Sequence, residues 1–195
     1  MENSKQNHRH FKIFKPFGVL SQFYTNAKHE KKKKFLGELF AFPESTMAIG
    51  RLDQASEGLL LLTTDGKLSY EICSKKIEKE YYVQVDGAIT EKAITQLKQG
   101  VEIGFDGTKY LTKPCKAYKF VTPPSFPERS RKIRDDRHGP TSWVSITINE
   151  GKYRQVRKMT SAVGFPTLRL IRVRVGTIIL DNMNSGDVVE VEKLL

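Results

Sequence analysis

The chain has 195 residues, and its 33 Lys and Arg exceed its 22 Asp and Glu to give a formal charge of +11. This length supports one domain, or two small ones, with a core that needs no covalent staple. The two cysteines, Cys73 and Cys115, cannot make a disulfide framework, residues 1–10 are polar, and the longest aliphatic run spans only residues 59–62. We therefore exclude disulfide-rich secreted and membrane-spanning classes and expect a soluble, cytoplasmic protein.

The positive charge is concentrated in three parts of the chain. Residues 31–34 and 129–137 lie beside glycine or proline and are predicted to be basic loops. Residues 151–174 contain no acid and seven basic side chains, namely Lys152, Arg154, Arg157, Lys158, Arg169, Arg172 and Arg174. Such a surplus favours a polyanionic partner, most often nucleic acid, because neutralised phosphates release counterions. A solvated cationic face without a partner is the alternative.

The N-terminal part of the chain predicts short strands followed by a helix. Residues 11–14 and 18–23 are expected to be extended. Residues 58–63 form an apolar run of strand length, which indicates a strand buried on both faces. Asp65 then has the side chain to cap a short helix that continues to residue 72.

A strand and a well-defined helix follow. Residues 81–85 alternate as a strand, so that Tyr81 and Tyr82 point to opposite faces. Thr90 is a suitable N-cap, and Gly100 is a suitable C-terminal glycine for the helix between them. Its apolar positions share one face and are Ala93, Ile94 and Leu97.

The C-terminal half contains mainly strands. Three short strands are predicted at residues 101–103, 110–112 and 115–121. Residues 143–148 alternate as a fourth strand, and residues 153–163 form a helix-like segment that ends at Gly164. In residues 169–175 basic and apolar side chains alternate, which predicts a strand with one apolar and one largely basic face. We therefore predict an α+β fold with a mostly antiparallel mixed sheet and flanking helices, not a doubly wound parallel sheet.

Several kinds of site are absent from the sequence. It contains neither of the glycine-rich nucleotide-binding motifs, so no nucleotide cofactor is expected, and it lacks the G-x-S-x-G turn of hydrolases. The histidines have no metal-ligand spacing with the cysteines, so no metal is expected; they are His8, His10, His29 and His138. The remaining candidates for chemistry are carboxylates, tyrosines and arginines.

Residues 50–66, G-R-L-D-Q-A-S-E-G-L-L-L-L-T-T-D-G, carry the most information. Asp53 lies just before the predicted buried strand, in a tight loop where backbone geometry can fix a catalytic side chain. The alternative is that Asp53 is an ordinary turn or cap residue paired with Arg51.

This segment resembles the catalytic loop of the RNA pseudouridine synthases of the ribosomal small-subunit synthase A family. Three further segments resemble that family's opening, tyrosine and arginine motifs, and they appear in the family's order at residues 14–23, 79–83 and 150–159. The resemblance implies a catalytic domain over residues 11–195, undivided or as two subdomains around one sheet, after a flexible polar terminus at residues 1–10. Within the family the chain is most similar to the large-subunit synthase E type, which lacks the S4-like RNA-binding domain of several relatives, and no such domain is expected here.

The resemblance also implies an activity, the isomerisation of uridine to pseudouridine in RNA. Asp53 matches the essential carboxylate, which acts either as the nucleophile on the sugar carbon or as a base that removes a sugar proton. Arg157 matches the arginine that orients it, although a phosphate contact is its alternative role. Tyr81 matches the tyrosine that stacks on the target base and can shuttle a proton, whereas a core aromatic is the alternative.

The remaining implications concern the substrate. Arg51 is expected to fill the gap left by the displaced nucleotide or to contact a phosphate. Further substrate-binding residues are expected in the arginine motif, namely Lys152, Arg154, Gln155 and Lys158. The implied partner is large-subunit (23S) ribosomal RNA, bound by a monomer without cofactor. The alternatives are a non-catalytic RNA-binding or ribosome assembly factor with the same fold, and a synthase for transfer RNA or small-subunit RNA.

Overall fold

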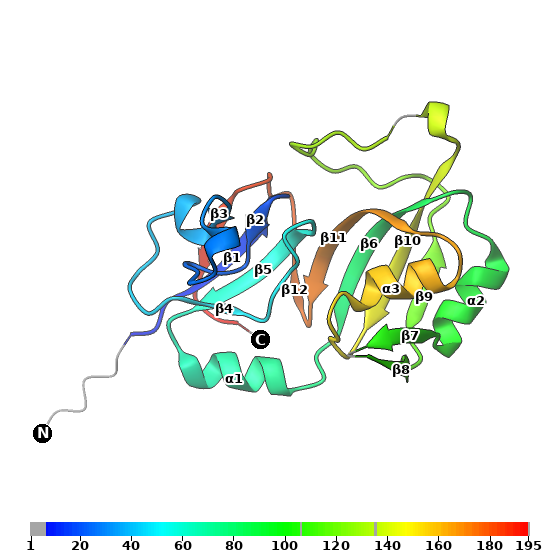
Figure 1. Ribbon diagram of the computed structural model, residues 1–195. Helices are drawn as coiled ribbons and strands as arrows, with labels where there is room; N and C mark the ends of the chain where they lie inside the picture. Colours follow the sequence, from blue (N-terminus) through cyan, green and yellow to red (C-terminus); the bar gives the residue numbers. More distant parts are fainter. Residues whose placement is uncertain (1–6, 106, 135, 195) are drawn as a thin grey trace, which may run out of the picture.

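The structure is a computed structural model that describes residues 7–105, 107–134 and 136–194 (Figure 1). Among these residues a nine-stranded sheet runs in the order β13-β1-β5-β11-β6-β10-β9, with β4 paired to β5 and β12 to β11. Its strands are β1 (His10–Lys15), β4 (Met47–Ile49), β5 (Glu57–Thr63), β6 (Lys79–Asp86), β9 (Lys116–Lys119), β10 (Thr141–Ile148), β11 (Thr167–Val175), β12 (Ile178–Ile179) and β13 (Val188–Val191).

The smaller elements lie around this sheet. Two two-stranded sheets are formed by β2 (Val19–Leu20) with β3 (Lys34–Phe35), and by β7 (Glu102–Phe105) with β8 (Thr108–Leu111). The α-helices of the described residues are α1 (Gly66–Ser74), α2 (Glu91–Gln99) and α3 (Gln155–Ala162), and the 3-10 helices are η1 (Lys28–Glu30), η2 (Leu36–Glu38) and η3 (Asp136–His138). In the described part of the chain no helix is long and apolar enough to cross a membrane.

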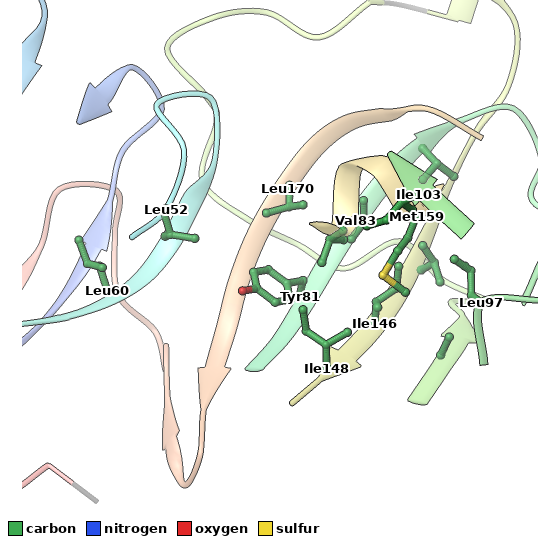
Figure 2. Close-up of a cluster of buried hydrophobic side chains, with 14 of the residues drawn as sticks. Leu52, Leu60, Tyr81, Val83, Leu97, Ile103, Ile146, Ile148, Met159 and Leu170 are labelled. Atoms are coloured by element: carbon green, nitrogen blue, oxygen red, sulfur yellow. The ribbon is translucent and has the colours of Figure 1, made fainter. Parts of the chain in front are cut away.

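The sheet is mixed and mostly antiparallel, as predicted. Each neighbouring pair of its strands in the described residues is antiparallel except β5 with β11, which is parallel. All seven residues of β5 are buried, because two separate hydrophobic clusters cover the two faces of the sheet. Leu60 and Leu62 belong to one cluster, together with residues of α2 and α3 (Figure 2), and Leu59 and Leu61 belong to the other. The continuous apolar run in β5 follows from this double burial.

The helices begin and end where their capping residues allow. Asp65 accepts hydrogen bonds from the backbone N–H groups of Lys67 and Leu68, and α1 continues to Ser74, two residues beyond the predicted end. The Thr90 side chain caps α2, which ends at Gly100 as predicted. By contrast, α3 begins at Gln155 and not at residue 153, because Arg154 adopts a left-handed conformation with φ +53° that no α-helix continues.

Tertiary contacts changed several predicted strands. Of residues 18–23 only β2 is a strand, and it pairs with β3, whose first residue, Lys34, belongs to a predicted loop. The strands β4, β12 and β13 were not predicted, because each is short and is stabilised by pairing with a distant segment. Residues 1–6 of the predicted flexible terminus lie outside the described residues, while Arg9 forms an ion pair with Glu190. The division at residue 10 stays a prediction.

The predicted basic face of β11 is wrong. Arg169 and Arg172 are buried, because β11 lies in the middle of the sheet between β5 and β6. A register shift between Arg172 and Arg174 then sends these two arginines to different faces. Arg172 is paired in register with Tyr81, whereas Arg174 donates a hydrogen bond to the Glu80 carboxylate, 2.9 Å away. A β-bulge of this kind breaks the alternation on which the prediction relied.

Gly58 allows the close parallel contact between β5 and β11. Its φ is +102°, and an added Cβ would clash with the carbonyl oxygen of Arg172 on β11. We predict that Gly58→Ala lowers the free energy of unfolding by about 2–5 kcal/mol, because backbone strain and overpacking add. Gly164→Ala, at φ +87° with nothing within 4 Å, is the control and should cost only about 1 kcal/mol. Urea unfolding curves measure both values, and equal losses would contradict the prediction.

Candidate active site

The loop that carries Asp53 connects β4 to β5 and is fixed on both sides of this residue. The Ser21 hydroxyl donates to the Leu52 carbonyl at 2.8 Å and accepts from the Leu52 N–H at 3.0 Å. On the other side, the Gly18 N–H donates to the Gln54 carbonyl at 2.8 Å, and Gln54 Nε2 donates back to the Gly18 carbonyl at 3.1 Å. These contacts hold the backbone of Asp53 against the segment that follows β1.

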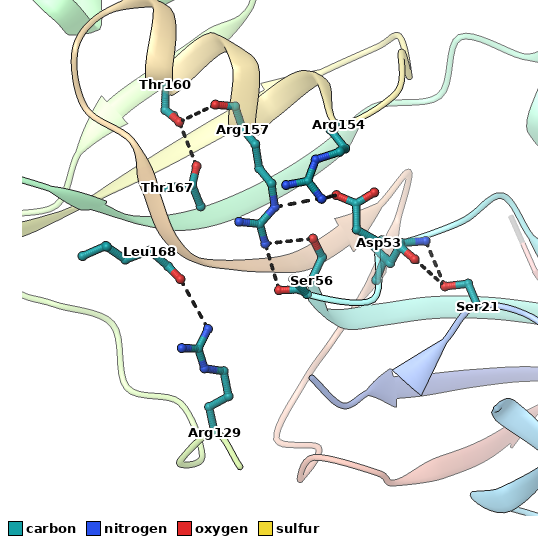
Figure 3. A network of polar contacts seen from close by, with 11 residues as sticks. Ser21, Asp53, Ser56, Arg129, Arg154, Arg157, Thr160, Thr167 and Leu168 are labelled. Atoms are coloured by element: carbon teal, nitrogen blue, oxygen red, sulfur yellow. Dashed lines mark hydrogen bonds and ion pairs between the residues drawn. The ribbon is translucent and has the colours of Figure 1, made fainter. Parts of the chain in front are cut away.

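Two arginines of the arginine motif lie beside the Asp53 carboxylate (Figure 3). Its Oδ2 is 3.6 Å from Arg157 Nε and 3.5 Å from Arg154 Nη1. Both contacts use the same oxygen, so the bidentate pair with Arg157 that a carboxylate can form is not present. No ion pair joins Asp53 to Arg51 in the described residues, so the alternative's pairing with Arg51 is wrong, although the Asp53 carbonyl does accept a turn hydrogen bond from the Ser56 N–H at 2.9 Å.

Arg157 is held firmly in place by the Asp53 loop itself. Its Nη2 donates to the Ala55 carbonyl at 2.8 Å and to Ser56 Oγ at 3.2 Å. Burial lowers the pKa of Arg157, Arg154 acts in the same direction and Asp53 opposes it, but a guanidinium stays charged at neutral pH. The loop thus fixes both the carboxylate and its cationic partner.

A pocket of about 530 Å³ opens beside Asp53. Tyr81 lines it and is 91% buried, at the edge of the hydrophobic cluster, with its hydroxyl directed away from Met159 (Figure 2). Tyr82 packs on the opposite face, 4.7 Å from the Phe120 ring, as strand alternation predicts. The pocket is lined by seven of the eight predicted site residues, namely Arg51, Asp53, Tyr81, Lys152, Arg154, Gln155 and Arg157.

Two of the predicted substrate-binding side chains are already bound within the protein. Lys158 lies outside the pocket, and its Nζ donates to the Gly104 carbonyl at 2.7 Å. Gln155 is 97% buried, and its Nε2 donates to Glu150 Oε1 at 2.5 Å while its Oε1 accepts from the Lys152 N–H. This geometry gives Gln155 a role in shaping the turn before α3, and a substrate contact by either residue stays a prediction.

The sequence profile of the RNA pseudouridylate synthase family matches residues 10–162, which include the loop, the tyrosine and both arginines. The chain belongs to this family. Ribosomal large subunit pseudouridine synthase E of Vibrio parahaemolyticus is 39% identical over 189 residues, which are 96% of this chain and 75% of the relative. The synthase E of Xanthomonas axonopodis pv. citri is 41% identical over 169 residues, 86% of this chain and 85% of the relative.

A solved structure agrees with the sequence comparisons. The crystal structure of a pseudouridylate synthase has a TM-score of 0.72 with 28% identity, over 94% of this chain and 70% of that one. The chain is therefore an RNA pseudouridine synthase, an isomerase with the α+β fold that the sequence predicted. Its described residues form the catalytic fold and contain no S4-like domain. The alternative of a non-catalytic RNA-binding factor is not supported.

Further charged groups of the synthase lie under the site and were missed. Glu57 and Arg169 form a buried ion pair with two hydrogen bonds of 2.8 and 3.0 Å, directly after the Asp53 loop. Burial would raise the pKa of Glu150, but hydrogen bonds from Tyr110, the Lys113 N–H and Gln155 lower it overall. No local pattern predicted the contact of Glu57 with Arg169 or those of Glu150 with Tyr110 and Lys113, because each joins segments that are distant in sequence.

Lys15 is another buried charge near the site. Its Nζ donates to the carbonyls of Pro16 and Val19 at 2.9 and 2.7 Å, which closes the turn that contacts the Asp53 loop. Burial lowers the pKa of Lys15 to about 7, although Glu57 and Asp53 act in the opposite direction. The available signal was strand alternation, which places Lys15 on the same buried face as Phe11 and Ile13.

The lowered pKa of Lys15 predicts a pH-dependent stability. Above pH 7 the native state releases the Lys15 proton, whereas the unfolded chain keeps it until about pH 10.5. The unfolded state then binds more protons, so the free energy of unfolding should rise between pH 7 and 9, by about 1.4 kcal/mol per pH unit for one proton. Lys15→Met should remove this rise, and Lys92→Met, at an exposed position of α2, should keep it. Urea unfolding at each pH measures the free energy of unfolding. The same change of this free energy with pH in wild type and Lys15→Met would contradict the prediction.

Proposed function

We propose that this synthase converts a specific uridine of large-subunit ribosomal RNA to pseudouridine, with Asp53 as the essential carboxylate. The observation that carries the proposal is the position of Asp53, between two arginines at a pocket that Tyr81 also lines. The choice of large-subunit RNA is supported by the names of the relatives, which are ribosomal large subunit synthases of type E.

The pocket is electrostatically suited to RNA. Among its described lining residues nine are basic and two, Asp53 and Glu150, are acidic. Only part of this cationic set was predicted to bind the substrate, and Lys75, Lys76 and Lys79 were missed. Lys75 and Lys76 follow α1, and Lys79 is the first residue of β6. We infer that phosphates of the RNA contact the exposed cations at the rim, where Arg51 lies. Such contacts supply affinity for a target base that must first leave its stack.

Within the pocket the target uracil would stack on the Tyr81 ring, and the ribose would lie at Asp53. In one route an Asp53 oxygen attacks C1′ while the C1′–N1 bond breaks, and uracil leaves with the electron pair. The freed base turns, C5 bonds to C1′ as the Asp53–C1′ bond breaks, C5 loses its proton to solvent and N1 gains one. In the other route Asp53 removes the C2′ proton as the C1′–N1 bond breaks, which gives a glycal and a uracil anion. After the base turns, C5 bonds to C1′ and Asp53 returns the proton to C2′, while C5 loses its proton and N1 gains one. Either route conserves atoms and electrons, so the proposal includes no cofactor.

Both routes require Asp53 to be correctly oriented. Arg157 is fixed by Ala55 and Ser56 and presents Nε to the carboxylate, and the backbone on either side of Asp53 is fixed by Ser21 and Gly18. Preorganised groups of this kind lower the barrier because they need not rearrange during reaction. We also expect the synthase to act as a cytoplasmic monomer.

Replacing the carboxylate tests the proposal. Asp53→Asn keeps the shape of the side chain but removes the nucleophile or base, so pseudouridine formation should fall by about a thousandfold or more. RNA affinity should change by no more than about threefold, because phosphate contacts supply most of it. Turnover is measured as tritium release from large-subunit ribosomal RNA labelled at uracil C5.

Asp181→Asn makes the same chemical change at an exposed ion pair with Lys12 and should keep wild-type turnover. If Asp53→Asn still forms pseudouridine at the wild-type rate, the role of Asp53 is wrong. If wild type releases tritium only from transfer RNA or small-subunit RNA, the choice of substrate is wrong.

A further inference from the structure

A second pocket, of about 310 Å³, lies on the other side of Arg157 from the active site. Arg157 lines both pockets, and Ala55, whose carbonyl it binds, lines the second. Figure 3 shows Arg157 with Asp53 on one side and with Arg129 and Leu168, which line the second pocket, on the other. The guanidinium therefore forms a wall between the two.

The second pocket is lined by cations and by no carboxylate among the described residues. The basic residues are Arg129, Arg131, Lys132, Arg134 and Arg157. The neighbouring acid Glu57 forms its two hydrogen bonds with Arg169, and Asp86 forms an ion pair with Arg134. Like charges gathered in one pocket repel each other, so binding of an anion there lowers their energy.

The loop that carries Arg129, Arg131 and Lys132 is attached to the body of the protein. The segment of residues 120–134 leaves the edge of the sheet after β9 (Figure 1). Arg169 Nη2 donates to the Pro127 carbonyl at 2.8 Å, and the Phe126 ring lies 5.9 Å from Trp143. Arg129 Nη1 donates to the Leu168 carbonyl at 3.3 Å, so the segment is attached to β11.

Donors in this pocket remain available for a ligand. Arg134 is the exception, because its guanidinium already contacts the Asp86 carboxylate and the His138 carbonyl. Both hydrogen bonds of the Arg157 guanidinium to other described residues come from Nη2, and Nη1 makes none to them. Arg131 and Lys132 have exposed side chains that reach solvent at the pocket. Guanidinium and ammonium groups in this arrangement match the oxygens of a phosphate.

We propose that the second pocket binds a backbone phosphodiester of the substrate RNA, on the strand that continues past the target nucleotide. This inference rests on the proposed function in taking RNA as the ligand. A phosphodiester is favoured because the pocket shares Arg157 with the active site, so one continuous strand can occupy both. The phosphate would contact Arg131 and Lys132 and complete the coordination of Arg157, which links RNA binding to the cation beside Asp53.

The test removes two exposed cations of the pocket and compares them with a matched pair elsewhere. The double variant Arg131→Gln/Lys132→Gln should bind large-subunit ribosomal RNA about tenfold more weakly. The slope of log Kd against log salt concentration should fall by the equivalent of about one to two phosphate contacts. Lys92→Gln with Lys98→Gln, on exposed positions of α2, removes the same charge and should change affinity less than about twofold. Fluorescence anisotropy with labelled RNA measures both, and thermal unfolding verifies that each variant is folded.

Equal affinities and salt slopes for the two variants would overturn the proposal. A competing source of phosphate is a free nucleotide, which is tested with uridine 5′-monophosphate. If that nucleotide binds wild type and not Arg131→Gln/Lys132→Gln, while RNA affinity is that of the α2 control, the RNA phosphodiester is the wrong ligand. The measurement needs no turnover, so a wild-type chain that binds this RNA without forming pseudouridine contradicts the proposed function and not this inference.

Discussion

The close parallel contact between β5 and β11 brings the parts of the active site together. Because Gly58 has no side chain, β11 approaches β5 directly and still pairs with β6 on its other edge. The loop before β5 carries Asp53, β6 carries Tyr81, and α3, which leads into β11, carries Arg157. The buried Glu57–Arg169 pair lies at the same contact, and losing either charge would leave the other buried without a partner.

Electrostatics dominates the region that this contact creates. The active-site pocket and the second pocket are both cationic, and Arg157 separates them. Burial lowers the pKa of Arg157 and Arg129 in these pockets, and that of Lys15 near the active site. Charges held in this way destabilise the free protein, but a polyanionic substrate can neutralise them. The cations of the site therefore have few carboxylates beside them within the protein, and this surplus of positive charge is complementary to RNA.

Local sequence patterns predicted those parts of the fold that local interactions determine. The helix α2 was predicted with both of its ends, because the Thr90 cap and Gly100 act within a few residues of the backbone that they stabilise. Asp53, Tyr81 and Arg157 were identified from motifs, and the structure places all three at one pocket. The prediction was wrong where neighbouring strands determine burial. The alternating pattern predicted Arg169 and Arg172 on an exposed basic face, but both are buried because their strand is covered on both sides.

The sequence by itself determined the α+β class, the positive charge, most strands and the residue types that the chemistry needs. Only the tertiary structure decided which cation faces which anion, that Arg154 joins Arg157 at Asp53, that Gln155 and Lys158 bind within the protein, and that Arg157 lies between two pockets. The physical reason is that hydrophobic periodicity and capping act over a few residues, whereas burial and ion pairing depend on segments that the chain brings together from far apart.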